Sequence, residues 1–173
     1  MKASAVLPLA LGVTGVLGLV ACGGGGGASR GASRPASPPV FFDFAALDGT
    51  HVSSETTRGR VTVVAFITTY DLPSQVLVRE LSDLVRRHKP RINALGVVLE
   101  PPKNAPLVET FAEALELGFT VTLADAATLE QRGPFGTITG VPTLVVLGPD
   151  GTERVRREGA PSPAELERAV DTP

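Results

Sequence analysis

The clearest pattern of hydrophobic positions lies between Val61 and Val85, where an apolar run is followed by a helical repeat. Residues 61–68 are apolar on both faces apart from two threonines, which is typical of a strand in the middle of a sheet. After Asp71–Ser74, apolar side chains recur on one helical face at Leu77, Leu81, Leu84 and Val85. We predict a buried strand that leads into a helix N-terminus, where unpaired backbone amides and the helix dipole favour chemistry.

Shorter patterns of the same kind predict the elements on either side. Strands are expected where short apolar runs are bounded by turn residues, at residues 40–44, after the turn at 47–52, and at 92–99, 119–123, 144–147 and 152–157. Helices are expected where helical spacing or a capping sequence occurs, near 53–59, from Asn104 to Gly118, within 124–133, and from the capping box Ser162–Glu165 through Val170. The predicted order is β, β, β-α-β, α-β and β-β-α.

The helix that Asn104 is expected to cap carries acidic residues on one side. Glu109, Glu113 and Glu116 lie opposite an apolar face formed by Val108, Phe111, Ala112 and Leu115. A charge run of this kind is most simply the solvated face of a helix that packs through its other side. We therefore assign these carboxylates no function from the sequence.

The N-terminus reads as a targeting signal. A short basic start, Met1–Lys2, precedes an apolar stretch from Ala3 to Leu19 and then the sequence Leu-Val-Ala-Cys ending at Cys22. This sequence resembles a bacterial lipobox, which implies a signal peptide over residues 1–21, cleavage before Cys22 and a lipid on the Cys22 sulfur. A membrane-spanning anchor is the alternative, since about 19 apolar residues just span a bilayer. The glycines and the proline within the stretch favour the signal peptide.

Residues 22–39 are predicted to tether a domain that covers residues 40–173. The tether contains five consecutive glycines followed by alanine, serine, arginine and proline, a composition that cannot bury a core. Gly23 follows Cys22, where the lipoprotein rule places aspartate for retention at the inner membrane. In a Gram-negative host the expected location is therefore the outer membrane, facing the periplasm.

Charge and residue counts exclude several classes of function. The net charge is −2, and we expect no nucleic-acid partner because such a surface needs a basic stripe. Cys22 is the only cysteine, so the chain cannot form an internal disulfide. The two histidines, His51 and His88, have no partner at ligand spacing, and we expect neither a metal nor another cofactor. We interpret His88 as a helix-end residue because no nucleophile lies near it in sequence.

Two motifs carry a resemblance to a known superfamily. Residues 66–75, Phe-Ile-Thr-Thr-Tyr-Asp-Leu-Pro-Ser-Gln, resemble the active-site segment of thioredoxin-like proteins, closest to the extracytoplasmic TlpA-type and redoxin (AhpC/TSA) branch. Residues 140–143, Gly-Val-Pro-Thr, resemble that superfamily's loop with a cis-proline facing the redox site. The resemblance implies a thioredoxin-like three-layer α/β/α sandwich with a mixed central sheet, and a cis bond before Pro142.

The residues depart from the superfamily where its chemistry is done. Tyr70 and Pro73 fit the motif, but Asp71 and Ser74 stand where the resemblance places the two redox cysteines. Thioredoxin chemistry needs a thiolate at the helix N-terminus and a second thiol, and Thr68-x-x-Asp71 likewise resembles a peroxiredoxin motif without its sulfur. Asp71 is a good helix cap; the alternative is an accessible carboxylate that binds a partner's cation or hydrogen-bond donor.

These observations leave more than one function open. The resemblance implies a peptide groove at Tyr70, Leu72, Val141, Pro142 and Thr143, in which backbone pairing gives affinity without a thiol. We expect a lipid-tethered binder of an envelope protein or peptide, with no catalytic residue in the degenerate motif Asp71, Leu72, Pro73 and Ser74. The alternative is a thiol-disulfide oxidoreductase or peroxidase of the same superfamily that acts with thiols outside this chain or by unrecognised chemistry. A third is a surface protein with no specific partner.

Overall fold

The computed structural model describes residues 37–171. The predicted signal peptide, Cys22 and most of the predicted tether lie outside the described residues. Within residues 37–171 no helix is long and apolar enough to cross a membrane. The strands are β1 (Asp43–Ala45), β2 (His51–Ser53), β3 (Val61–Ile67), β4 (Ile92–Val98), β5 (Thr120–Leu123), β6 (Thr143–Leu147) and β7 (Glu153–Glu158). The helices are α1 (Ser54–Thr57), α2 (Leu72–His88), the 3₁₀ turn η1 (Pro102–Asn104), α3 (Ala105–Ala114), α4 (Ala126–Leu129) and α5 (Pro163–Asp171).

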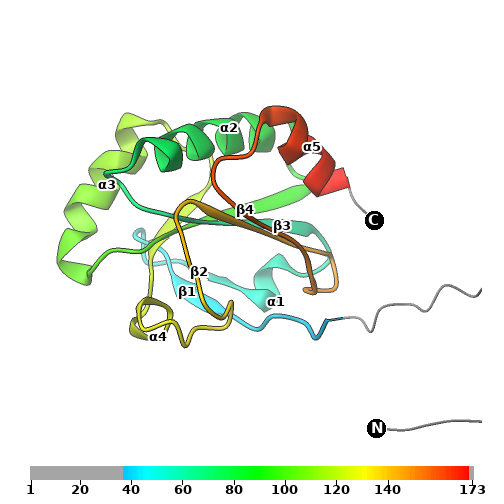
Figure 1. The fold of residues 1–173 in the computed structure, drawn as a ribbon, viewed down its shortest axis with the longest axis horizontal. Coiled ribbons are helices and arrows are strands. Elements are labelled where there is room, and N and C mark those ends of the chain that lie inside the picture. Colours follow the sequence, from blue (N-terminus) through cyan, green and yellow to red (C-terminus); the bar gives the residue numbers. More distant parts are fainter. Residues whose placement is uncertain (1–36, 172–173) are drawn as a thin grey trace, which may run out of the picture. The chain divides into compact units, whose positions relative to one another are not determined.

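A mixed five-stranded sheet with the order β5-β4-β3-β6-β7 forms the centre of the domain (Figure 1). β4 runs parallel to both β3 and β5, whereas β6 is antiparallel to both β3 and β7. β1 and β2 form a separate antiparallel hairpin. β3 occupies the middle of the sheet, as its continuous apolar sequence predicts.

Side chains of β3 alternate between two hydrophobic cores, one on each face of the sheet. Val63, Ala65 and Ile67 contact the inner faces of α2, α3 and α5; in Figure 1 α2 and α5 lie above the sheet and α3 lies at its left. Val64 and Phe66 face the other way, toward the hairpin and the segment before β6, where Phe42, Phe44 and Phe135 pack together. The structure therefore confirms the predicted three layers, which follow from the period of two along a strand.

The helix boundaries differ from the sequence expectation in two informative places. α2 begins at Leu72, inside the segment taken as a junction, because Asp71 is already its N-cap. Asn104 precedes α3 but makes no side-chain cap bond, so the capping role expected for it is wrong; its amide instead donates to Glu100 at 2.7 Å. The Ser162–Glu165 box forms through Glu165, whose carboxylate accepts from the Ser162 backbone N–H and hydroxyl.

The aromatic core predicts a large difference between two phenylalanines. Phe66 is fully buried and its ring packs edge-on against Phe135 at 5.2 Å between centroids. We expect Phe66→Ala to lower the free energy of unfolding by about 3–5 kcal/mol, through lost burial and the cavity left behind. Phe41 is 68% exposed, and Phe41→Ala should change it by less than about 0.5 kcal/mol. Urea unfolding followed by circular dichroism measures both, and equal losses would contradict this assignment of the core.

Candidate functional site

The two motifs singled out in the sequence meet at one edge of the sheet. β3 and β6 are antiparallel with Phe66 opposite Thr143, so the end of β3 and the start of β6 lie side by side. The segment from Thr68 to Ser74 leaves β3 at this edge and the segment ending at Pro142 enters β6 there. The Val141–Pro142 bond is cis, which confirms the expectation from the sequence.

Asp71 closes the N-terminus of α2. Its Oδ1 accepts from the backbone N–H of Ser74 at 3.0 Å, and its Oδ2 accepts from the Thr68 hydroxyl at 2.8 Å. Partial burial of the carboxyl opposes ionisation, but the hydrogen bonds from Ser74 and Thr68 outweigh it and hold the pKa of Asp71 below its usual value. Both oxygens are thus engaged within the chain, and the predicted capping role is confirmed.

Ser74 is part of the same junction and is not available for chemistry. Its side chain is fully buried, and its Oγ accepts from the backbone N–H of Thr68 at 3.2 Å. A general-base role for Asp71 acting on Ser74 would require the hydroxyl to donate to the carboxylate and to reach substrate, and the burial of Ser74 prevents the second. The pair fixes the strand end to the helix start.

A buried carboxylate from the neighbouring strand completes this network. Glu100 follows β4 and is 2% exposed. Its Oε1 accepts from both the backbone N–H and the hydroxyl of Thr69, each at 2.7 Å, and its Oε2 accepts from the Asn104 amide. Burial opposes ionisation of Glu100, but these hydrogen bonds outweigh it and lower its pKa. Gln75 adds a bond from its amide to the Thr69 carbonyl at 3.2 Å.

Sequence reasoning missed Glu100, although the sequence contained a signal for it. Glu100 follows an apolar strand that the β-α-β pattern places parallel to β3. The carboxyl ends of adjacent parallel strands lie at the same edge of a sheet. The topology alone therefore predicts that Glu100, which follows β4, lies near Thr69, which follows β3. What the sequence did not show is that Glu100 is buried, because that depends on donors from Thr69 and Asn104.

The cis-proline loop offers backbone groups rather than side chains. Pro142 and Thr143 are buried, and the Thr143 hydroxyl donates to the Gly140 carbonyl at 2.7 Å, so the Thr143 side chain is not a contact surface for a partner. Val141 is exposed, and within the described residues its backbone N–H and C=O have no hydrogen-bond partner. Free backbone groups beside a strand are what an added extended peptide pairs with.

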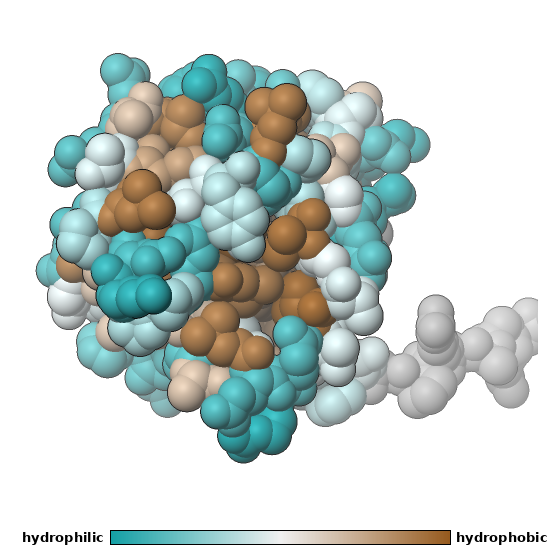
Figure 2. All heavy atoms as spheres, turned by 60° about the vertical axis from the view of Figure 1, so that its left-hand side comes forward, coloured by the Kyte–Doolittle hydropathy of each residue, from teal (hydrophilic) through white to brown (hydrophobic). Residues whose placement is uncertain are grey.

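Exposed apolar side chains gather around this edge. Six large hydrophobic side chains are exposed in residues 37–171, and all but Phe41 belong to the segments that follow β3 or β4 or that precede β6. Tyr70 (77% exposed) and Leu72 (70%) flank Asp71, Val76 follows on α2, Leu107 lies in the first turn of α3, and Val141 precedes the cis-proline. Figure 2 looks onto this side of the molecule and shows brown apolar groups collected on it among teal ones. Clustered exposed apolar surface is typical of interaction sites.

The histidines lie elsewhere. His88 ends α2, and its Nε2 lies 2.6 Å from Glu167 of α5, which accounts for it as a helix-end residue. His51 lies on the β1–β2 hairpin and contacts Asp43 at 2.9 Å. In residues 37–171 no cluster of histidine, cysteine, aspartate or glutamate has the arrangement of a metal site.

Comparison with known proteins identifies solved structures with a similar fold. No protein-family model and no curated protein sequence matches the chain. Among solved structures, a thioredoxin-family thiol:disulfide interchange protein from Chlorobium tepidum TLS is similar with a TM-score of 0.70, 23% identity and coverage of 80% of this chain and 97% of that one. StoA from Bacillus subtilis is similar with a TM-score of 0.64, 20% identity and coverage of 78% and 99%.

A third similar structure is a secreted disulfide oxidoreductase of Mycobacterium tuberculosis, with a TM-score of 0.62, 21% identity and coverage of 75% of this chain and 93% of that one. This chain has a thioredoxin-like fold. At this level of identity the likeness concerns the fold and not the reaction.

The cap in the thioredoxin-like domain predicts a graded effect of substitution. Asp71→Ala removes the acceptor for Ser74 and should lower the free energy of unfolding by about 1 kcal/mol, whereas Asp71→Asn keeps a capping oxygen and should lose less. Because the pKa of Asp71 is lowered in the folded state, the ionised carboxylate stabilises above the usual value of 3.8 and this stabilisation is lost as pH falls through the folded pKa. Urea unfolding of all three proteins at neutral and acid pH tests this; an advantage over Asp71→Asn that persists in acid would contradict it.

Proposed function

We propose that this protein is a lipid-tethered, extracytoplasmic thioredoxin-like domain that binds an extended segment of an envelope protein without dithiol chemistry. The observation that carries the proposal is the unpaired backbone of Val141 beside a cis-proline, at the sheet edge after which the exposed side chains of Tyr70 and Leu72 also follow β3. An extended peptide pairing with Val141 would satisfy these backbone groups and cover the apolar side chains.

The hydrogen bonds at the junction between β3 and α2 favour a binding role over a redox role. Asp71 and Ser74 satisfy the amides of the strand end and helix start, and neither side chain supplies a thiolate. The proposed anchor is the lipid on Cys22, the only cysteine, whose sulfur would then be unavailable for exchange. Similarity to secreted and interchange proteins supports a location outside the cytoplasm. The alternative activity, disulfide exchange or peroxide reduction, would need sulfur from another chain.

Site-specific photo-crosslinking in cells tests the binding surface. We expect a photoreactive residue at Leu72 in the full lipidated chain to capture a discrete partner, because its exposed side chain follows β3 at the sheet edge where Val141 precedes β6. The matched control is Phe41, which is apolar and equally exposed, at 68% against 70%, but lies before β1. The same adducts from both positions, or none at Leu72 in a folded chain, would contradict the proposal.

Introducing cysteines at positions 71 and 74 tests whether these positions correspond to the two redox cysteines of the superfamily. In a chain with Cys22→Ser, we expect Asp71→Cys/Ser74→Cys to form a reversible disulfide and to accelerate insulin reduction by dithiothreitol, because a thiol at the start of α2 gains the dipole and free amides. The single Asp71→Cys variant should not catalyse turnover, since it lacks a resolving thiol. Activity of the unaltered protein above background would favour the alternative, and a folded double variant that never oxidises would refute the positional assignment.

A further inference from the structure

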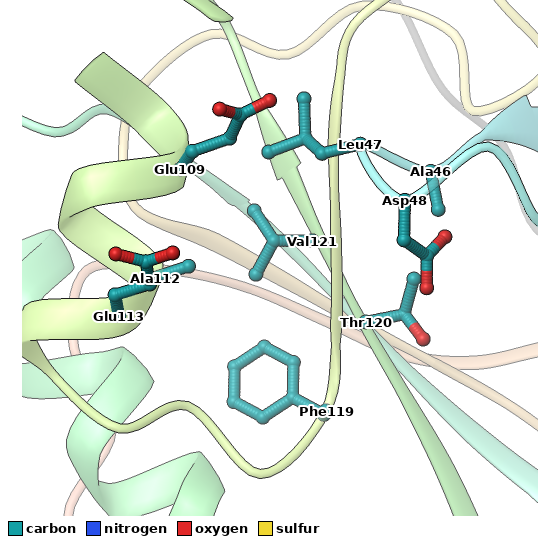
Figure 3. A pocket seen from close by; sticks show the side chains of 9 residues that line it. All are labelled: Ala46, Leu47, Asp48, Glu109, Ala112, Glu113, Phe119, Thr120 and Val121. Carbon is teal, nitrogen blue, oxygen red and sulfur yellow. The ribbon is translucent and has the colours of Figure 1, made fainter. Parts of the chain in front are cut away.

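A hollow separate from the thioredoxin-like motif lies between α3, the turn after β1 and the edge strand β5 (Figure 3). Its volume is about 310 Å³, within the range of about 300–1,000 Å³ that small-molecule sites occupy. Its lining includes no residue of the Asp71–Ser74 or Val141–Thr143 segments. We call it the acidic hollow, for the three carboxylates on its walls.

The floor of the acidic hollow is apolar. Val121 of β5 is largely buried, and Phe119, Ala112 and Leu47 are partly buried around it. In Figure 3 the side chains of Leu47, Val121 and Phe119 fill the middle of the view, between α3 and the turn that carries Asp48. Such a floor accepts hydrocarbon from a ligand, because covering apolar surface removes it from water.

The carboxylates stand on both walls. Glu109 and Glu113 lie four residues apart on α3, on one side of the floor, and Asp48 lies on the other side (Figure 3). No lysine, arginine or histidine is among the lining residues. The α3 carboxylates are therefore not only a solvated helix face, as the sequence alone indicated, since they border a concave apolar surface.

Within residues 37–171 these charges lack compensation. Neither Glu109 nor Glu113 has a hydrogen bond or an ion pair in the described part of the chain. Asp48 Oδ1 accepts from the Thr50 backbone N–H at 2.9 Å and hydroxyl at 2.7 Å, and these bonds keep the pKa of Asp48 below its usual value. The walls thus present exposed carboxylates with no cation among the lining residues, and an ammonium group placed beside them is attracted to them.

We propose that the acidic hollow binds an aliphatic di- or polyamine, with ammonium groups at Asp48 on one wall and at Glu109 and Glu113 on the other. The methylene chain would cross the floor at Val121 and Leu47. Separated carboxylates favour such a ligand over a metal ion, which needs its ligands gathered within bonding distance. A single lysine side chain would neutralise one wall only, so a ligand cationic at both ends matches the hollow better.

Calorimetric titration of the full-length chain in non-ionic detergent with spermidine tests the proposal. We expect saturable 1:1 binding at low ionic strength and none for an uncharged diol of equal length. Glu109→Gln/Glu113→Gln should weaken binding about tenfold by removing both charges of one wall. Glu80→Gln/Glu116→Gln makes the same change in charge away from the hollow and should leave affinity within about twofold. Ala112→Leu should weaken it about tenfold by narrowing the hollow at unchanged charge.

Three outcomes would overturn the assignment. Equal spermidine affinity in Ala112→Leu and the unaltered chain would mean that the amine is held by surface charge alone. If magnesium displaced spermidine as effectively as a diamine of equal charge, the ligand would likewise be held by surface charge alone. Binding of a lysine-containing peptide, blocked by Glu109→Gln/Glu113→Gln, with no binding of spermidine would assign the hollow to a protein partner. Because Leu72 and Val141 are unchanged in all these variants, the test is independent of the proposed peptide surface.

Discussion

The start of α2 imposes the constraint on which this edge of the domain depends. A helix N-terminus leaves backbone N–H groups without partners, and here it adjoins the end of the buried central strand, where Ser74 is out of reach of water. The carboxylate of Asp71 accepts a hydrogen bond from the Ser74 N–H, and the Ser74 hydroxyl accepts one from the Thr68 N–H. The Thr68 hydroxyl in turn donates to the carboxylate of Asp71. The strand end and the helix start thus satisfy one another's polar groups.

The same electrostatic environment has different consequences for a thiol and for a carboxylate. A helix N-terminus lowers the pKa of an acidic group placed there, which makes a thiolate reactive. A carboxylate is ionised at neutral pH without help, and in this protein its oxygens bond to Ser74 and Thr68. The positive end of α2 therefore stabilises a cap. The features left for recognition are the exposed Tyr70 and Leu72 and the unpaired backbone of Val141.

The sequence predicted the features that depend on residues close together in the chain. The β3–α2 junction and the cap at Asp71 follow from neighbouring residues, whereas the cis bond before Pro142 is implied by the resemblance of residues 140–143 to the superfamily's loop; the structure confirms all three. Asn104 looked like a cap by the same rule, yet its amide is bonded to Glu100. The burial of Glu100 depends on donors from Thr69, 31 residues away in the chain, and the failure at Asn104 follows from it because that buried carboxylate accepts the Asn104 amide. Thr143 is buried where β6 pairs with Phe66 of the distant strand β3. No periodicity within one segment reports such contacts.

α3 connects the two surfaces to which a ligand is assigned. Leu107 in its first turn belongs to the apolar edge, and Glu109 at the next exposed position borders the acidic hollow. Val108 of this helix is fully buried, and Phe111 and Ala112 pack against the same core while partly exposed. The bond that Asn104 donates to Glu100, together with the two bonds that Thr69 donates to the same carboxylate, fixes the start of α3 to the loop that follows β3. The buried carboxylate of Glu100 therefore helps to position the helix that carries Leu107 and Glu109, although Glu100 itself does not line the hollow.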